Sequence, residues 1–242
     1  MQDEVRRYYD AILPFYDESL ADRGDLPFWE AMAAGSKRIL ELGCGTGRVT
    51  EVLVRRAEVT AVDLLVEMLR RASRRVPGAQ LVAADLRQFA FAERFDLIVL
   101  ADDPMAHLIS IDDRANVLQL IRDHLTRDGR VVIEGLYRRE AGASRHQHGD
   151  LMVEESWTAT DDSSVFNAHY RYTKGASSVD VDALMRSWSV EDVSPLTVEN
   201  VWGDFDRSPF LPDSPRMIMV AKRSREPGSR GDAGDAEGSA AS

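Results

Sequence analysis

The sequence predicts an α/β protein built on a doubly wound, mostly parallel β-sheet, with extra antiparallel strands in its C-terminal half. Two observations predict this fold class. Between residues 37 and 135, short runs rich in Val, Ile and Leu alternate with segments of helical periodicity, a pattern typical of right-handed βαβ units. After residue 135, several runs alternate apolar and polar residues, which favours antiparallel strands.

The expected elements follow from these patterns along the chain. Helices are expected at 3–19 and 26–34, and Pro14 should break or kink the first, because proline has no backbone N–H to donate. Core strands are expected at the apolar runs 37–42, 57–63, 79–85, 95–102 and 129–135, with helices at 46–56, 65–75 and 112–126. Later strands are expected at 150–157, 165–173, 183–190 and 216–223. Pro195 leaves room for only a very short helix between residues 190 and 200.

Composition and charge narrow the class of protein. The chain has 242 residues and a formal net charge of -11, and this acidity disfavours non-specific nucleic-acid binding, which needs clustered Lys and Arg. The basic run 70–75 has helical spacing and is interpreted as a solvated face. Cys44 is the single cysteine, and the sequence has neither a membrane-length apolar run nor a signal peptide. We therefore expect a cytoplasmic protein that contacts neither nucleic acid nor membrane.

The stretch ILELGCGTGRVT, residues 39–50, turns from apolar to glycine-rich where the first core strand should end. Ligands of open α/β sheets bind at the carboxyl ends of the strands. Gly43, Gly45 and Gly47 would let the backbone turn sharply and approach a ligand closely. A helix beginning near Thr46 would point its N-terminal amides at the same place, where they favour a negatively charged group.

Two aspartates end the next two expected strands. Asp63 can accept hydrogen bonds from both hydroxyls of a ribose, and Asp85 stands where the edge of an adenine would then lie. Helix capping or turn formation is the alternative role for both. Arg48 occupies the position at which dinucleotide-binding motifs have their third glycine, which argues against a bound pyrophosphate.

The string E-L-G-C-G-T-G resembles motif I of the class I S-adenosylmethionine-dependent methyltransferases. The resemblance continues, with every block in order, through residues 59–69, 83–91, 95–108 and 124–135. It implies a seven-stranded sheet whose last strand is antiparallel, with S-adenosylmethionine lying across the strand ends.

The resemblance also implies roles for particular residues. The implied cofactor-binding residues are Gly43, Cys44, Gly45, Gly47, Asp63, Leu64, Asp85, Leu86 and Ala101. The glycines and Ala101 would lie at the methionine end, with Cys44 as a small packing residue. Asp63 would hold the ribose and Leu64 would pack on the adenine. Asp85 and the backbone of Leu86 would address the adenine amino group.

The segment ADDPMAHL, residues 101–108, follows the fourth core strand, where an acceptor should meet the methyl group. His107 has a suitable ordinary pKa for taking a proton from an amine or a hydroxyl. Asp102 and Asp103 could orient an amino group or stabilise a cationic acceptor. Turn formation before Pro104 is the alternative role for the aspartates, and a plain loop position is the alternative for His107.

The same segment resembles the corresponding block of bacterial N-methyltransferases that act on amino sugars attached to nucleotides. In those enzymes a histidine stands at the position of His107, and an N-terminal tyrosine matches Tyr9, which we include among the candidate catalytic residues. The two aspartates depart from that subgroup and disfavour an anionic diphosphate. Tyr8, Tyr9 and Tyr16 are expected to include residues of a lid, with ordinary helix packing as the alternative.

Four regions are expected from these patterns. Residues 1–35 would form N-terminal lid helices, 36–136 the cofactor-binding α/β core, and 137–222 the completion of the sheet and a cap over the substrate. Residues 223–242 would be a disordered tail, because they lack aromatic and large aliphatic residues.

The expected function is methyl transfer from S-adenosylmethionine to a nitrogen or oxygen of a small metabolite, with nitrogen slightly favoured. One alternative is a regulatory or scaffold protein that binds the cofactor without methyl transfer, since 190–200 is short for the helix and strand expected there. A nucleic-acid methyltransferase is a weaker alternative. We expect no metal, because His146 and His148 are only a pair in a polar segment, and we expect a monomer or a homodimer.

Overall fold

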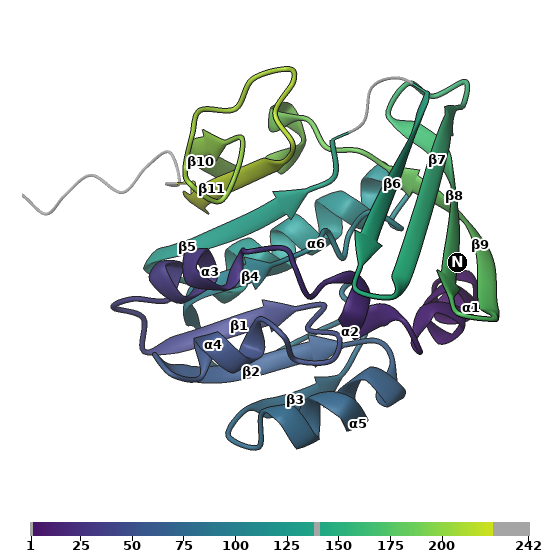
Figure 1. Cartoon of the computed structure of the whole chain (residues 1–242). Coiled ribbons are helices and arrows are strands. Elements are labelled where there is room, and N and C mark those ends of the chain that lie inside the picture. Colours follow the sequence, from purple (N-terminus) through teal and green to yellow (C-terminus); the bar gives the residue numbers. More distant parts are fainter. Residues whose placement is uncertain (1, 138–140, 225–242) are drawn as a thin grey trace, which may run out of the picture.

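The computed structural model of the protein describes residues 2–137 and 141–224, which form two β-sheets (Figure 1). The larger one, sheet A, has seven strands in the order β10-β11-β5-β4-β1-β2-β3. These strands are β1 (Arg38–Leu42), β2 (Glu58–Asp63), β3 (Gln80–Ala83), β4 (Phe95–Leu100), β5 (Leu125–Gly135), β10 (Leu196–Trp202) and β11 (Met217–Arg223). Strands β1 to β5 run parallel, and β11 is antiparallel to both of its neighbours. The expected doubly wound, mostly parallel seven-stranded sheet is confirmed.

Helices cover both faces of sheet A. The helices of the described residues are α1 (Gln2–Ile12), α2 (Tyr16–Ser19), α3 (Leu26–Met32), α4 (Thr50–Leu53), α5 (Val66–Arg75) and α6 (Ile111–His124). Ile39 of β1 packs in a cluster with Trp29 of α3 and Leu53 of α4, whereas its neighbour Leu40 packs with Ile121 of α6 on the opposite face. Burial on both faces explains why the core strands have continuously apolar sequences.

The second sheet, sheet B, is an antiparallel meander in the order β6-β7-β8-β9. Its strands are β6 (Gly142–His148), β7 (Leu151–Ala159), β8 (Val165–Lys174) and β9 (Ser177–Arg186). Tyr8 and Ile12 of α1 and Phe15 pack against its apolar face, in a cluster with Phe166 and Tyr172 of β8. Sheet B and α1 therefore stand together beside the carboxyl ends of the parallel strands (Figure 1).

The helix expected after the glycine stretch is much shorter than predicted. It was expected over 46–56, but α4 begins at Thr50 and contains four residues. Gly45 and Gly47 have positive φ angles of 55° and 83°, whereas an α-helix needs φ near −60°. The left-handed glycines therefore delay the start of the helix, and the expectation of helix amides at Thr46 was wrong.

Other differences lie in the C-terminal half. Polar composition concealed β6, which forms because it pairs with β7 along its length. Strand β9 starts at Ser177 rather than at 183, and Trp188 lies beyond its end. The very short helix expected between 190 and 200 is confirmed as a 3-10 turn over Val190–Val193, but β10 follows it and completes the sheet. The predicted disordered tail lies, from residue 225 onward, outside the described residues.

Candidate active site

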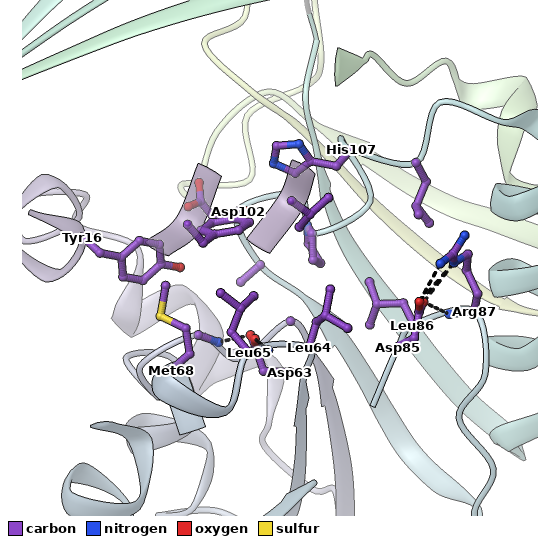
Figure 2. Close-up of a pocket in the computed structure, with 17 residues that line it drawn as sticks. Tyr16, Asp63, Leu64, Leu65, Met68, Asp85, Leu86, Arg87, Asp102 and His107 are labelled. Atoms are coloured by element: carbon purple, nitrogen blue, oxygen red, sulfur yellow. Dashed lines mark hydrogen bonds and ion pairs between the residues drawn. The ribbon is translucent and has the colours of Figure 1, made fainter. Parts of the chain in front are cut away.

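A pocket, here called the strand-end pocket, lies at the carboxyl ends of β1 to β4 (Figure 2). Its lining comes from four strand ends, from α5 and from the N-terminal helices. The lining residues are Val5, Tyr9, Tyr16, Gly43, Gly45, Asp63, Leu64, Leu65, Met68, Asp85, Leu86, Arg87, Ala101, Asp102, Pro104, His107 and Leu108. Seven of the nine expected cofactor residues are therefore brought together, and Cys44 and Gly47 are not among the lining.

Asp63 lies at the tip of β2 and its carboxylate is buried in the pocket wall. The backbone N–H groups of Gly45 and Leu65 each donate a hydrogen bond to it at 2.8 Å. Burial raises the pKa of Asp63, while these N–H groups act in the opposite direction. A carboxylate so fixed retains lone pairs that can accept ligand hydroxyls.

The glycines are required by close contacts within the protein as well as by their φ angles. A Cβ atom on Gly43 would lie 2.3 Å from Cβ of Pro104, and one on Gly45 would lie 2.8 Å from the hydroxyl of Tyr16. Gly47 instead approaches Ala72 of α5. Cys44 is buried in the core and burial raises the pKa of its thiol, so a packing role fits this residue.

On the far side of the pocket, Asp85 is engaged by Arg87. The Nη2 atom of Arg87 lies 2.7 Å from Oδ2 of Asp85, and its Nε atom lies 3.0 Å from Oδ1 (Figure 2). Arg87 also contacts Asp113 at the start of α6 at 3.2 Å. Sequence reasoning missed Arg87, although the local signal was its place two residues after Asp85.

The loop after β4 carries both candidate aspartates in left-handed backbone conformation, with φ of 59° at Asp102 and 40° at Asp103. Such a conformation costs a non-glycine residue about 1–3 kcal/mol. The buried Asp103 accepts hydrogen bonds from the N–H groups of Leu136 (2.6 Å) and Met105 (3.2 Å) and from Nε1 of Trp188 (3.0 Å). The side chain of Asp103 therefore holds the loop in its conformation. This role is closer to turn formation, the alternative given above, than to acceptor binding.

Asp102 has a different environment. Its side chain is 39% exposed and accepts a hydrogen bond from Nη1 of Arg23 at 2.8 Å. Its backbone N–H donates to Oε2 of Glu134 at 2.9 Å, and Arg23 also binds Glu134. Arg23 and Glu134 had no signal in the sequence, because they meet only when residues 13–25 fold over the strand ends.

Residues 13–25, here called the lid segment, carry α2 and join α1 to α3. Asp17 accepts a hydrogen bond from the hydroxyl of Thr46 at 2.5 Å and forms an ion pair with Arg75 at 3.1 Å. Arg48, at the position of the missing third glycine, donates to Asp25 at 2.6 and 2.7 Å. The lid segment is thus tied to the glycine loop at its middle, through Asp17, and at its C-terminal end, through Asp25.

A second cavity, here called the sheet B chamber, lies between the lid segment, the strand ends and sheet B. Four residues line both cavities, namely Tyr9, Tyr16, Asp102 and His107. Aromatic rings from α1 and sheet B, among them Tyr8, Tyr170 and Tyr172, form much of the chamber wall. The two cavities therefore meet at three of the four candidate catalytic residues. The fourth, Asp103, lines only the sheet B chamber.

His107 lies at this junction between two tyrosine rings. Its ring centroid is 5.1 Å from that of Tyr8 and 5.5 Å from that of Tyr9. Burial lowers the pKa of His107 to about 4. The imidazole is therefore neutral near pH 7 and has one nitrogen free to accept a hydrogen bond.

No helix in 2–137 or 141–224 is long and apolar enough to cross a membrane. Within those same ranges, no group of three or more His, Cys, Asp and Glu side chains is arranged to hold a metal ion.

Comparison with known proteins gives a consistent pattern. Residues 39–129 match the family described as methyltransferase domain. The chain is 40% identical over 107 residues to a malonyl-[acyl-carrier protein] O-methyltransferase of Halorhodospira halophila, covering 39% of this chain and 36% of the relative. It is 26% identical over 144 residues to a dTDP-3-amino-3,4,6-trideoxy-alpha-D-glucopyranose N,N-dimethyltransferase of Streptomyces venezuelae, covering 59% and 60%. These matches span less than two thirds of either relative.

Solved structures extend the likeness of fold to most of the chain. The CcbJ methyltransferase from Streptomyces caelestis superimposes with a TM-score of 0.77 at 19% identity, covering 90% of this chain and 98% of that one. An S-adenosylmethionine-dependent methyltransferase from Clostridium acetobutylicum gives 0.73 at 19% identity, covering 88% and 98%. The fold, sheet B included, is thus shared well beyond the family match.

Proposed function

We propose that this chain, whose residues 39–129 match a methyltransferase domain and whose fold is shared with an S-adenosylmethionine-dependent methyltransferase, is a class I S-adenosylmethionine-dependent methyltransferase that transfers a methyl group to a nitrogen or oxygen of a small metabolite. One observation carries this proposal. The strand-end pocket and the sheet B chamber share Tyr9, Tyr16, Asp102 and His107. A cofactor in the first cavity and an acceptor in the second would meet at these side chains.

The residues of the strand-end pocket fit the cofactor that the family uses. Asp63 is positioned to accept the ribose hydroxyls, and Leu64 and Leu86 offer apolar contacts to the adenine. S-adenosylmethionine, when bound, supplies a methyl group already activated by a positively charged sulfur. The work left to the protein is therefore mainly to position the acceptor and to exclude water.

At the junction, the neutral His107 can accept a hydrogen bond from an acceptor N–H or O–H and so aim its lone pair at the methyl group. The carboxylate of Asp102 can stabilise the positive charge that a neutral amine nitrogen gains as it takes the methyl group. The described chamber lining holds the acids Asp102, Asp103, Glu134 and Glu155 against the guanidinium groups of Arg23 and Arg216. This balance supports nitrogen over oxygen as the nucleophile.

A protein that binds the cofactor without methyl transfer was considered because the segment 190–200 is short. That observation no longer favours it, since the 3-10 turn over Val190–Val193 leads into β10, which completes sheet A. The chamber beside the pocket also gives an acceptor a place to bind. Methyl transfer is therefore the function that the geometry supports best.

Calorimetric titration with S-adenosylmethionine and with S-adenosylhomocysteine tests the cofactor site. We expect wild-type protein to bind both, and Asp63→Ala to bind at least about 100-fold more weakly, since a buried charged acceptor is lost. Asp182→Ala, on the outer face of sheet B, is the control and should bind like wild type. Equal binding by wild type and Asp63→Ala would refute the assigned cofactor site.

Methyl transfer itself needs a second measurement. Purified protein is incubated with S-adenosylmethionine and matched amines, alcohols and carboxylic acids, and formation of S-adenosylhomocysteine is followed. We expect turnover with an amine first and an alcohol second. If the protein binds the cofactor but gives no turnover with any acceptor in a broad panel, the result would favour the alternative of a protein that binds the cofactor without methyl transfer.

A further inference from the structure

Arg114 is an arginine in the first turns of α6 whose side chain is almost entirely buried, at 4% exposure. It donates hydrogen bonds to four main-chain carbonyl oxygens in two separate segments. Those of Leu108 (2.9 Å) and Met105 (3.2 Å) belong to the loop after β4, and those of Arg186 (2.6 Å) and Ser187 (3.3 Å) lie at the end of β9. One guanidinium group thus joins sheet B to the loop that carries Asp102 and His107.

Trp188 and Asp103 complete this junction. The guanidinium carbon of Arg114 lies 4.6 Å from the ring centroid of Trp188, a cation–π arrangement. The indole N–H of Trp188 donates to Asp103 at 3.0 Å, and its backbone N–H donates to the carbonyl of Leu136 at 2.9 Å. The positive charge of Arg114 is therefore buried among carbonyl dipoles, an aromatic face and a nearby carboxylate.

The same loop is held by the backbone of sheet B. The N–H of Arg186 donates to the carbonyl of Ala106 at 2.8 Å, and its Nε donates to the carbonyl of Ile109 at 2.7 Å. Ala106 directly precedes His107, so these contacts bracket the histidine. Left-handed backbone at two adjacent aspartates persists only where the surroundings enforce it, and these contacts provide that enforcement.

We propose that Arg114 is a positioning residue for methyl transfer: it locks the loop 102–109 onto the end of sheet B, so that His107 and Asp102 face the acceptor only while sheet B is docked. This role rests on the proposed function of the site. Sheet B then does more than cover the acceptor, because it sets the geometry of the loop 102–109, which carries Asp102 and His107. Arg114 is not itself among the lining residues of either cavity, and it acts only through the loop.

The burial of His107 provides a readout that needs no knowledge of the acceptor. Tyr8 and Tyr9 of α1 enclose its ring, and Asp102 stands nearby on the same loop. With the loop locked, burial keeps the pKa of His107 near 4. If the loop is released, the imidazole meets water and its pKa returns toward the ordinary value of about 6.5.

The test is an NMR titration of histidine-labelled protein, with the signal of His107 assigned from His107→Gln, alongside calorimetric binding of S-adenosylhomocysteine. We expect Arg114→Met to raise the pKa of His107 above 5. Arg114→Lys keeps the charge and part of the hydrogen bonding, so the pKa of His107 in this variant should fall between those in wild type and in Arg114→Met. Arg94→Met is the matched control, because Arg94 also donates to main-chain carbonyls, at the far end of α6, and should leave His107 unchanged.

Trp188→Phe is the second variant, used if Arg114→Met does not fold. It keeps the aromatic face but removes the hydrogen bond to Asp103, and we expect a smaller rise in the pKa of His107. An unchanged His107 titration in folded Arg114→Met, or in Trp188→Phe when Arg114→Met fails to fold, would overturn the positioning role. Failure of wild-type protein to bind S-adenosylhomocysteine would instead count against the proposed function, since the histidine titration does not depend on the cofactor.

Discussion

The strand-end pocket and the sheet B chamber are neighbours, yet they are built in opposite ways. The pocket is made from short segments at successive strand ends, and each carries its chemistry within a few residues of a predictable boundary. The chamber is made from α1, the lid segment, β5 and sheet B, whose residues meet only through long-range contacts such as Arg23 with Asp102 and Glu134. Local motifs can therefore identify a cofactor site while leaving the acceptor site undefined.

The largest effect is expected at Gly43, in the wall of the strand-end pocket. Gly43→Ala places a Cβ at 2.3 Å from Pro104 and at a φ of 78°, so we expect a loss of about 3 kcal/mol in the free energy of unfolding. Denaturant unfolding measures it. Gly78→Ala is the matched control, because nothing lies within 4 Å of its added Cβ, and its stability should stay close to wild type. Equal stability of the two variants would contradict the contact with Pro104.

A smaller and more selective effect is expected at the junction. We expect His107→Ala to reduce turnover roughly tenfold or more, because an aligned hydrogen bond to the acceptor is lost, with cofactor affinity preserved. Since burial lowers the pKa of His107 to about 4, its imidazole stays neutral from pH 6 to 9 and should add no ionisation to the pH–rate profile there. Full turnover of His107→Ala across that range would remove His107 from the reaction.

The pH dependence of the melting temperature should reveal the buried carboxyl group of Glu41. Burial raises the pKa of Glu41 from 4.5 to about 8, with Thr50 donating to it at 2.6 Å. A raised folded pKa means that the stabilisation is present below pH 4.5 and is lost as pH rises toward 8. The stability of Glu41→Gln lacks this dependence. We therefore expect its melting temperature to rise relative to that of wild type as pH increases from 5 to 8. Parallel curves for the two proteins would show that Glu41 ionises normally.

The smallest effect concerns the tie between the lid segment and sheet B. Glu18 pairs with Lys174 at the surface, where both side chains are partly exposed, and such pairs contribute at most about 1 kcal/mol. We expect Lys174→Ala to change the melting temperature by no more than a few degrees and to make S-adenosylhomocysteine dissociate slightly faster. Stopped-flow dissociation at low salt checks this, and an unchanged rate would mean that the pair does not hold the lid segment.

Much of sheet A and of the strand-end pocket could be predicted from the sequence, because Asp63, Asp85 and the glycines directly follow apolar runs that must be buried strands. The start of the helix after the glycines could not, since Gly45 and Gly47 adopt left-handed φ angles, beside Tyr16 and α5, that the sequence pattern does not reveal. Strand β6 was missed because its polar sequence gains strand structure only from β7. Arg114 was missed for a related reason, since its carbonyl partners in β9 lie more than seventy residues away along the chain.

The contact between Tyr16 and Gly45 has a consequence for the timing of the reaction cycle. If S-adenosylhomocysteine occupies the strand-end pocket as proposed, we expect it to leave after residues 13–25 move away from the glycine loop, because Tyr16 lies against Gly45 and Asp17 contacts Thr46 and Arg75. The residence time of S-adenosylhomocysteine would then be governed by the lid segment's ion pairs, and rising ionic strength, which screens them, should shorten it. The same lid would make the protein most sensitive to inhibition by its own product when salt is low.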